Sequence, residues 1–282
     1  MENKDMKPTI SIKGELHLFD TPKVMGIINT TPDSFFSRSR TPESNAIAER
    51  VERMIEEGVD YFDVGGYSSR PGASDISADE EYSRLAPALE IIRKISPETP
   101  VSVDTFRASV ARKCIEDWNV EIINDISGGT LDPEMWGTVA EAGVAYILMH
   151  LRGTPATMQQ FTDYKDVVAE VLSDLAFKIA SLRQLGVSDI IIDPGFGFAK
   201  TVEQNFTLLS KLKVFRETGC PILAGLSRKS MIWKTLGSSP EDALNGTTAL
   251  NMAALMNGAD ILRVHDVAEA RECVKLFNKL NR

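Results

Sequence analysis

The chain has 282 residues, of which 43% are hydrophobic and 25% charged, and this composition suits one large α/β domain. Its 40 acidic and 31 basic residues give a formal net charge of −9, which argues against a general nucleic-acid binder. No apolar run reaches the roughly 18 residues of a membrane helix, and we expect no membrane insertion. The N-terminal MENKDMKPTI has no signal-peptide core, and Cys114, Cys220 and Cys273 form no C-x-x-C motif, so we expect a cytoplasmic protein with free thiols.

Short β-rich runs alternate with helical periodicity along almost the whole chain. Thr9–Ile12 and Glu15–Leu18, separated by Lys13-Gly14, predict a hairpin within an N-terminal extension, residues 1–22. The strands expected after it are Val24–Asn29, Tyr61–Val64, Val101–Val103, Glu121–Asn124, Val144–Met149, Ile190–Asp193, Pro221–Ala224 and Ile261–Val264. The expected helices are about Asn45–Glu57, Asp79–Ile95, Tyr164–Leu185, Val202–Leu212, Lys229–Leu236, Pro240–Asn257 and Val267–Leu280, with two more that begin near Arg107 and Pro133.

This alternation predicts a single domain over residues 1–282. Eight β-runs that are each followed by a helix match the unit count of a closed (β/α)8 TIM barrel. An open doubly wound sheet shares the same alternation and is the alternative. The barrel is favoured because the eighth unit ends the chain and no unit is missing.

A polar residue stands at the end of each expected strand. In order, these residues are Asn29, Asp63, Asp104, Asn124 with Asp125, His150, Asp193, the Ser227–Ser230 segment with Lys229, and Arg263 with His265. Each one alone is explained as well by a helix cap or a structural hydrogen bond. In a barrel, however, all of them face the one rim where strands end and catalysis occurs. Their convergence therefore predicts an active site.

The residue types at this rim suit a flat, nitrogen-rich ring that carries an anionic group. Asp104, Asn124 and Asp193 could surround such a ring, because a carboxylate accepts two parallel N–H bonds. Lys229 could donate to a ring carbonyl, and the planar guanidinium of Arg263 could stack on the ring face.

The neighbouring first and eighth strands offer a phosphate pocket. Asn29, Arg263 and His265 could together bind a monophosphate or a diphosphate. The chain has three histidines and no H-x-x-x-H spacing, which argues against a transition-metal site. A Mg²⁺ ion held mostly by phosphates and water, with Asn29 as one ligand, is compatible. The Pro- and Ser-rich stretches 30–44, which contains Phe35, and 65–77 are expected to be mobile loops that cover the site.

The motifs in this order resemble the dihydropteroate synthase family of pterin-binding barrels. They are MGIINTTPDSFF, DVGGYSSRPG, VDTFRASVA, INDISGG, MHLRGTPATMQ, DPGFGFAK, GLSRKSMI and RVHDV, and they span almost the whole chain. The resemblance implies that pterin pyrophosphate and p-aminobenzoate condense to dihydropteroate, and that sulfonamides compete with p-aminobenzoate. It also implies a homodimer through the Ala- and Leu-rich helices near the C-terminus.

The same resemblance implies a role for each matching residue. Asp104, Asn124, Asp193 and Lys229 would hold the pterin, with Arg263 stacked on it and Asp63 at the same rim. Met149 and Phe198 would be apolar walls of the slot. Asn29, Arg263 and His265 would bind pyrophosphate with Mg²⁺. The p-aminobenzoate pocket would be formed by Ser69, Arg70, Pro71 and Ser230, closed by Phe35.

Two loops depart from the family pattern. Tyr67-Ser68-Ser69 stands where the family usually has Glu-Ser-Thr, and FFSRSR replaces a Ser-Asp-Gly-Gly-like end. These departures leave open a non-catalytic pterin-binding protein. A corrinoid-dependent methyltransferase would share the pterin residues without the phosphate set. A Schiff-base aldolase would use Lys229, with its pKa lowered by the neighbouring Arg228.

Overall fold

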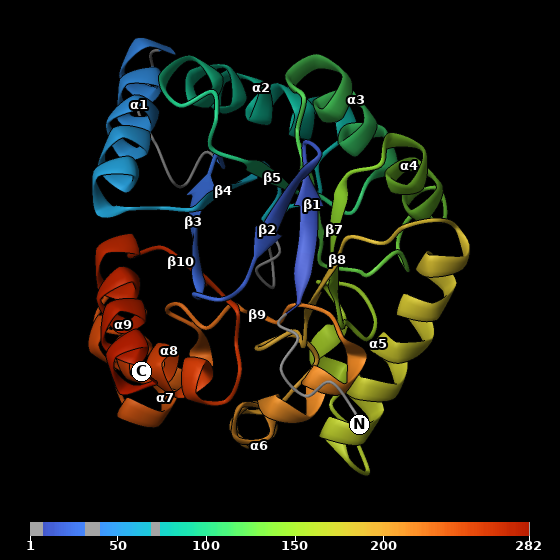
Figure 1. The fold of residues 1–282 in the computed structure, drawn as a ribbon, viewed down its shortest axis with the longest axis vertical. Coiled ribbons are helices and arrows are strands. Elements are labelled where there is room, and N and C mark those ends of the chain that lie inside the picture. Colours follow the sequence, from blue (N-terminus) through green and yellow to red (C-terminus); the bar gives the residue numbers. More distant parts are fainter. Residues whose placement is uncertain (1–7, 32–39, 69–73, 282) are drawn as a thin grey trace.

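The computed structural model describes residues 8–31, 40–68 and 74–281. Within them, eight parallel strands form a barrel surrounded by helices (Figure 1). The strands are β3 (Lys23–Asn29), β4 (Tyr61–Gly65), β5 (Val101–Asp104), β6 (Ile122–Asp125), β7 (Ala145–Met149), β8 (Ile190–Asp193), β9 (Leu223–Ala224) and β10 (Ile261–Val264). Each matches an expected strand, with ends that differ by up to two residues.

The order of the strands closes the sheet. Neighbours run β8-β7-β6-β5-β4-β3-β10-β9, so the first and last strands of the series, β3 and β10, lie side by side. A parallel bridge joins Ile192 to Ile222, and the Ile192 N–H donates to the Pro221 carbonyl at 2.9 Å. The remaining gap, between β8 and β9, is therefore bridged as well. The prediction of a TIM barrel is confirmed, and the open doubly wound sheet is excluded.

Helices follow the strands around the outside of the barrel (Figure 1). They are α1 (Arg40–Glu57), α2 (Ala78–Ile95), α3 (Ala108–Trp118), α4 (Met135–Ala142), α5 (Val167–Gln184), α6 (Val202–Ser210), α7 (Ser230–Leu236), α8 (Leu244–Met256) and α9 (Val267–Leu280), with 3₁₀ helices η2 (Met158–Gln160) and η3 (Leu212–Thr218). The 3₁₀ helix η3 lies mostly between the expected helix Val202–Leu212 and the expected strand Pro221–Ala224, where no element was expected.

Helix starts were the least accurate expectation. Helix α1 begins at Arg40 and not near Asn45, so the first predicted loop is shorter than residues 30–44. Pro42 is tolerated there because the N–H groups of a first helical turn have no partner within the helix. Helix α5 begins at Val167 and not at Tyr164, because the Asp166 carboxylate caps it by accepting from the backbone N–H groups of Val168 and Ala169. Helix α8 likewise begins at Leu244, after the expected Pro240.

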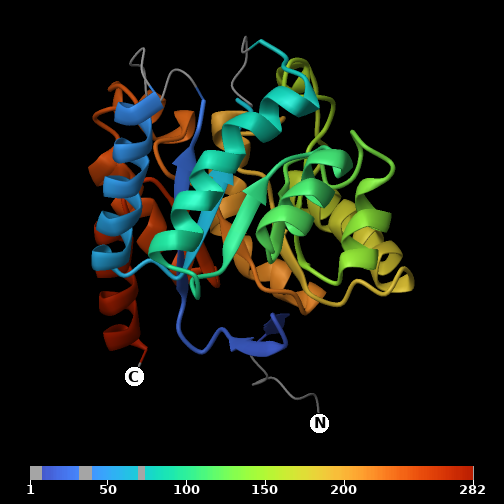
Figure 2. The ribbon, with the colours of Figure 1, turned by 90° about the horizontal axis from the view of Figure 1, so that it is seen from above.

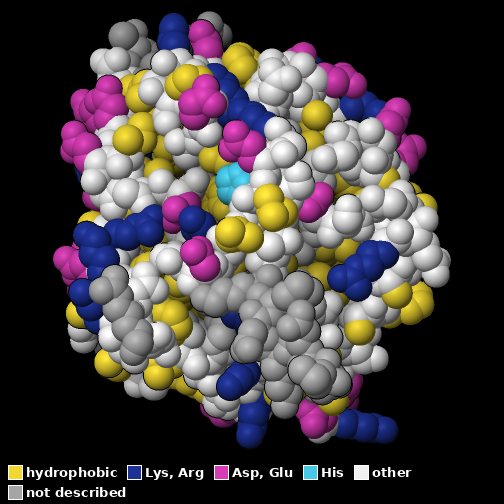
Figure 3. Space-filling view, viewed as in Figure 1, with side chains coloured by type: hydrophobic (Ala, Val, Ile, Leu, Met, Phe, Trp, Pro, Cys, Tyr) yellow, Lys and Arg dark blue, Asp and Glu magenta, His cyan; other side chains and the backbone are white. Residues whose placement is uncertain are grey.

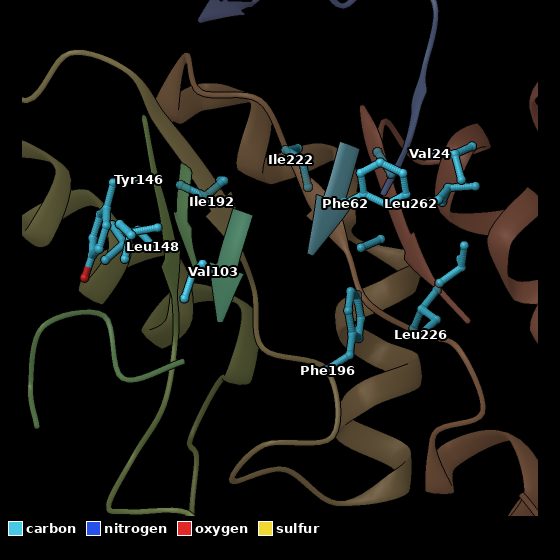
Figure 4. Packing of buried hydrophobic residues seen from close by; sticks show 14 of the residues in the cluster. Val24, Phe62, Val103, Tyr146, Leu148, Ile192, Phe196, Ile222, Leu226 and Leu262 are labelled. Carbon is cyan, nitrogen blue, oxygen red and sulfur yellow. The ribbon is translucent and has the colours of Figure 1, made fainter. Parts of the chain in front are cut away.

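Two apolar layers hold the barrel together. Alternate strand residues face outward against the helices, as Val24, Phe62 and Ile192 do in Figure 4. The residues between them, such as Met25 and Ile191, face inward and form a second cluster. Because both layers are fully buried, the strands position their terminal polar side chains on a rigid scaffold.

The predicted N-terminal hairpin is confirmed and closes one end of the barrel. Strands β1 (Thr9–Ile12) and β2 (Glu15–Leu18) pair antiparallel, and Figure 2 shows them beyond the end of the barrel where its strands begin. Ile10, Ile12 and Phe19 pack into the inward-facing cluster. On this face, acidic, basic and hydrophobic side chains are interspersed (Figure 3). The opposite end is the rim where the strands end. No helix among the described residues is long and apolar enough to span a membrane.

Candidate active site

An arginine between two aspartates forms the centre of the rim. Arg263 on β10 donates from Nε to Asp63 Oδ2 at 2.6 Å and from Nη2 to Asp104 Oδ2 at 2.7 Å. Burial alone would lower the pKa of Arg263, but the two carboxylates raise it above its ordinary value. The guanidinium is therefore a permanent cation in a fixed plane.

The two aspartates differ in exposure. Asp63 on β4 is completely buried, and its Oδ2 also accepts from Asn124 Nδ2 at 3.2 Å. The side chain of Asp104 on β5 is 23% exposed. Burial raises the pKa of Asp104 to about 7, although Arg263 opposes this shift. Asp63 thus orients Arg263 and Asn124, whereas Asp104 keeps an accessible edge for a ligand.

Lys229 and Asp193 place a cation and an anion beside the same glycine of the rim. A Cβ placed on Gly225 would lie 3.6 Å from Lys229 Nζ and 3.8 Å from Asp193 Oδ2, so both groups lie beside this glycine. Burial raises the pKa of Asp193, and burial lowers the pKa of Lys229 to about 8. Asp193 Oδ1 also accepts from the Gly195 N–H at 2.7 Å.

The Arg228 side chain binds Asp266 and, contrary to what the aldolase alternative assumed, is not among the groups that lower the pKa of Lys229. Arg228 has a left-handed φ of 56°, and its guanidinium makes a two-bond ion pair with Asp266, with both distances 2.9 Å. The low pKa of Lys229 comes from burial, with Arg263 as the cation that lowers it further. Lys229 Nζ donates to the Phe196 carbonyl. Arg228 therefore connects the loops after β9 and β10, and the premise of a nucleophile activated by Arg228 is wrong.

The expected phosphate residues lie at the junction of β3 and β10. Asn29 ends β3, and a Cβ on Gly65 would lie 3.8 Å from Asn29 Oδ1 and 3.9 Å from Asp104 Oδ2. His265 follows β10, and burial together with Arg263 lowers its pKa to about 4. Ser230 begins α7, directly after Lys229. Neighbouring strands thus bring Asn29, Asp104 and Arg263 to one side of the rim.

An apolar wall lies at the rim, where β5, β6, β7 and β8 end. Met149 and Phe198, both expected there, belong to one cluster. Its other members, which the sequence did not single out, are Ile126, Leu151, Met158, Ala199 and Phe106. Ile126 follows β6 directly, and Phe106 lies two residues after β5. An apolar residue just after a strand is therefore the sequence feature that could have predicted these members of the wall.

A buried lysine holds the backbone of the loop that carries Phe198. Lys200 Nζ lies 2.9 Å from the Gly195 carbonyl, 3.0 Å from the Phe198 carbonyl and 3.1 Å from His150 Nδ1. Burial lowers the pKa of Lys200 to about 7. Lys200 thereby fixes the loop that presents the Phe198 ring, and it is a positioning residue that the sequence did not single out.

Four expected binding residues, Phe35, Ser69, Arg70 and Pro71, lie outside the described residues. Among the residues that the structure does describe, no three His, Cys, Asp or Glu side chains gather as a metal site. Asn29 offers an amide oxygen beside the expected phosphate pocket. A single amide oxygen fits a Mg²⁺ ion that takes most of its ligands from phosphates and water.

Comparisons with known proteins agree with this geometry. The family model described as pterin binding enzyme matches residues 25–265. This chain belongs to the pterin binding enzymes, and within them to the dihydropteroate synthases. It is 41% identical to the dihydropteroate synthase of Synechocystis sp. over 93% of this chain and 92% of that protein.

Two solved structures are similar along almost their whole length. The dihydropteroate synthase of Xanthomonas albilineans with 4-aminobenzoic acid has a TM-score of 0.88 and 35% identity, and covers 98% of this chain and 99% of its own. That of Yersinia pestis with a sulfonamide drug complex has a TM-score of 0.89 and 32% identity, and covers 97% of this chain and 98% of its own.

The unusual Tyr67 has a defined place in this family framework. Its ring meets Phe106 edge-on, with centroids 5.0 Å apart and an interplanar angle of 88°. The Arg107 guanidinium lies 5.1 Å from the Tyr67 centroid and 4.7 Å from that of Phe106. Arg107 also binds Glu81 and Asp75. The departure at residue 67 therefore exchanges a carboxylate for an aromatic contact with the slot wall.

Proposed function

We propose that this chain condenses 6-hydroxymethyl-7,8-dihydropterin pyrophosphate with p-aminobenzoate, giving 7,8-dihydropteroate and pyrophosphate. The observation that carries the proposal is the pairing of Arg263 with both Asp63 and Asp104 at the rim where the strands end. The dihydropteroate synthases among its relatives support the same reaction.

The pterin binds flat against Arg263. Arg263 donates from the edge of its guanidinium, through Nε to Asp63 and through Nη2 to Asp104. The face of the guanidinium is left to stack on the ring. The open edge of Asp104 accepts ring N–H groups, and Asn124 and Asp193 bind the remaining polar edge. Lys229 donates to the ring carbonyl, while Met149 and Phe198 pack along the slot.

The pyrophosphate leaves before the amine of p-aminobenzoate attacks. The C–O bond between the exocyclic CH₂ and the pyrophosphate breaks, and its electron pair leaves with the pyrophosphate. The positive charge left on carbon spreads into the dihydropterin ring, where Asp104 and Asp193 stabilise it. The amine nitrogen of p-aminobenzoate then bonds to the CH₂ and loses a proton to solvent.

The leaving group is bound where β3 and β10 meet. Arg263 neutralises part of its charge, His265 donates a hydrogen bond, and Asn29 would hold a Mg²⁺ ion together with the phosphates. Bound Mg²⁺ would neutralise developing charge on the phosphate oxygens. Support comes from the Asn29 oxygen lying beside Gly65, close to Asp104.

The second substrate enters beside the CH₂ group. Ser230, next to Lys229, helps to shape its pocket together with Ser69, Arg70, Pro71 and the closing Phe35. Sulfonamides compete at this end, in keeping with the drug complex of the Yersinia pestis relative.

We also propose a cytoplasmic homodimer. The three cysteines are free and buried, as suits a reducing compartment. Leu236 and Met256, from α7 and α8, are large apolar side chains that stay exposed in the single chain. A second copy packed on this face would cover them. Sedimentation equilibrium of the wild type and of Met256→Glu tests this: a dimer that Met256→Glu converts to monomer supports it, and a wild-type monomer contradicts it.

The deciding experiment measures pyrophosphate release from the pterin pyrophosphate with Mg²⁺, with and without p-aminobenzoate, and identifies dihydropteroate by mass spectrometry. Release that depends on p-aminobenzoate and yields dihydropteroate is expected. Pterin binding without release would contradict the synthase and favour a non-catalytic pterin-binding protein. Asp104→Asn serves as the matched comparison with lowered turnover expected, because it keeps the size of the side chain and removes its charge.

A further inference from the structure

A serine outside the expected binding set holds His265. Ser227 lies in the loop after β9, and His265 lies directly after the neighbouring strand β10. The Ser227 Oγ is 3.0 Å from His265 Nδ1 and 3.2 Å from the backbone nitrogen of His265. Ser227 is 6% exposed, so its hydroxyl must find its partners within the protein. One hydroxyl thus holds both the ring and the backbone of His265.

The direction of these bonds follows from counting protons. The backbone N–H of His265 can only donate, so it uses a lone pair of Ser227 Oγ. The hydroxyl proton then has one acceptor among the described residues, which is His265 Nδ1. If Nδ1 carried the proton instead, the buried hydroxyl would donate to nothing. The network therefore assigns the ring proton to Nε2, for which the described residues supply no partner.

The position of the ring proton matters because the His265 ring is neutral. Burial and the nearby Arg263, Arg228 and Arg50 lower the pKa of His265 to about 4, against the opposing pull of Asp266. Arg50 Nη2 also donates to the His265 carbonyl, which fixes the backbone. At neutral pH the ring has a single N–H group, and its position decides whether the ring offers a donor or a lone pair to an anion.

We infer that Ser227 is a positioning residue that holds His265 in the Nε2-protonated form, so that Nε2–H donates to the departing pyrophosphate. The inference rests on the proposed function of His265 for its consequence, but the assignment of the proton does not. With the other tautomer, the Nε2 lone pair would face the anionic oxygens and repel them.

The proton position can be read without substrate. Nitrogen-15 NMR of histidine-labelled protein at pH 7 distinguishes a protonated from an unprotonated ring nitrogen, and His265→Ala identifies the signals of His265 among the three histidines. The expected wild-type spectrum shows protonated Nε2 and unprotonated Nδ1. Ser227→Ala should give a mixture of tautomers, and Ser227→Thr, which keeps the hydroxyl, should restore the wild-type pattern. A wild-type ring protonated at Nδ1, or a Ser227→Ala spectrum identical to wild type, would overturn the inference.

Kinetics then test the consequence by a double-mutant cycle. Ser227→Ala should lower kcat about 10-fold, the size of one lost hydrogen bond to a charged group. It should add no further loss to His265→Ala, because Ser227 acts through that ring. Ser239→Ala, a hydroxyl bonded to Asp242 outside the site, should match wild type. Fully additive losses would contradict a role through His265. If His265→Ala alone leaves kcat unchanged while the NMR pattern holds, the proposed role of His265 fails and the tautomer assignment stands.

Discussion

Each end of the barrel contains a buried carboxylate bound to an arginine. At the rim, a second carboxylate bound to the same arginine is partly exposed. At the hairpin end, Glu121 is 4% exposed and is bound by Arg93 Nη2 at 2.8 Å, the Val101 N–H at 2.8 Å and Lys13 Nζ at 2.6 Å. At the rim, Arg263 unites Asp63 and Asp104, and Asp104 remains accessible. The chain itself completes the first cluster, whereas in the proposed function a ligand completes the second. In the proposed function, similar ion pairs serve stability at one end and substrate binding at the other.

Breaking the closed cluster should have the largest effect, on stability alone. Glu121→Gln is expected to lower the free energy of unfolding by about 3 kcal/mol, because Arg93 keeps a partly buried charge without its partner. Its kcat should stay within about twofold of wild type, since the site lies at the other end. Urea unfolding and steady-state kinetics measure both. Glu141→Gln, in an exposed pair with Arg112, is the matched control and should cost at most about 1 kcal/mol. A parallel loss of kcat in folded Glu121→Gln would contradict the division between the ends.

Breaking the open cluster should reverse this pattern. Asp104→Asn is expected to lower kcat about 100-fold, because a carboxylate that stabilises the pterin cation becomes neutral. The free energy of unfolding should change by less than about 1 kcal/mol, since Arg263 keeps Asp63 as its buried partner. Single-turnover kinetics and urea unfolding give the two values. Unchanged turnover would show that Asp104 does not stabilise positive charge in the reaction.

The open cluster should also make pterin binding depend on pH. Burial raises the pKa of Asp104 to about 7, so the carboxylate that accepts ring N–H groups is lost as pH falls below that value. The dissociation constant of 6-hydroxymethylpterin should therefore rise by up to about tenfold per pH unit below pH 7. Above the Lys229 pKa of about 8, binding should weaken again as that cation is lost. Calorimetric titration between pH 5.5 and 9 measures this. Asp104→Asn should flatten the acidic limb, and an unchanged limb would assign it to another group.

The sequence predicts the barrel well because local patterns encode it. Each βα unit has its own alternation and its own helix signals, and the polar residues at strand ends converge once the sheet closes. What it could not predict are contacts between distant residues. Asp63 and Arg263 are 200 positions apart, and nothing local distinguishes a buried orienting aspartate from an accessible one. For the same reason, the sequence could not show that the Arg228 side chain binds Asp266 in the next loop instead of acting on Lys229.

The smallest expected effect concerns Tyr67, where the open end differs from its family. The ring braces Phe106 against the apolar wall, and an aromatic pair is worth about 0.5–1.5 kcal/mol. Tyr67→Ala should therefore weaken binding of 6-hydroxymethylpterin about 3- to 10-fold. Tyr67→Phe should stay within about twofold of wild type, because it keeps the ring and the Arg107 contact. Calorimetry of both variants decides whether the ring or the hydroxyl matters. If Tyr67→Phe loses as much affinity as Tyr67→Ala, the hydroxyl and not the aromatic contact supports the slot, and the wall would have to be stabilised by Arg107 through Glu81 and Asp75 alone.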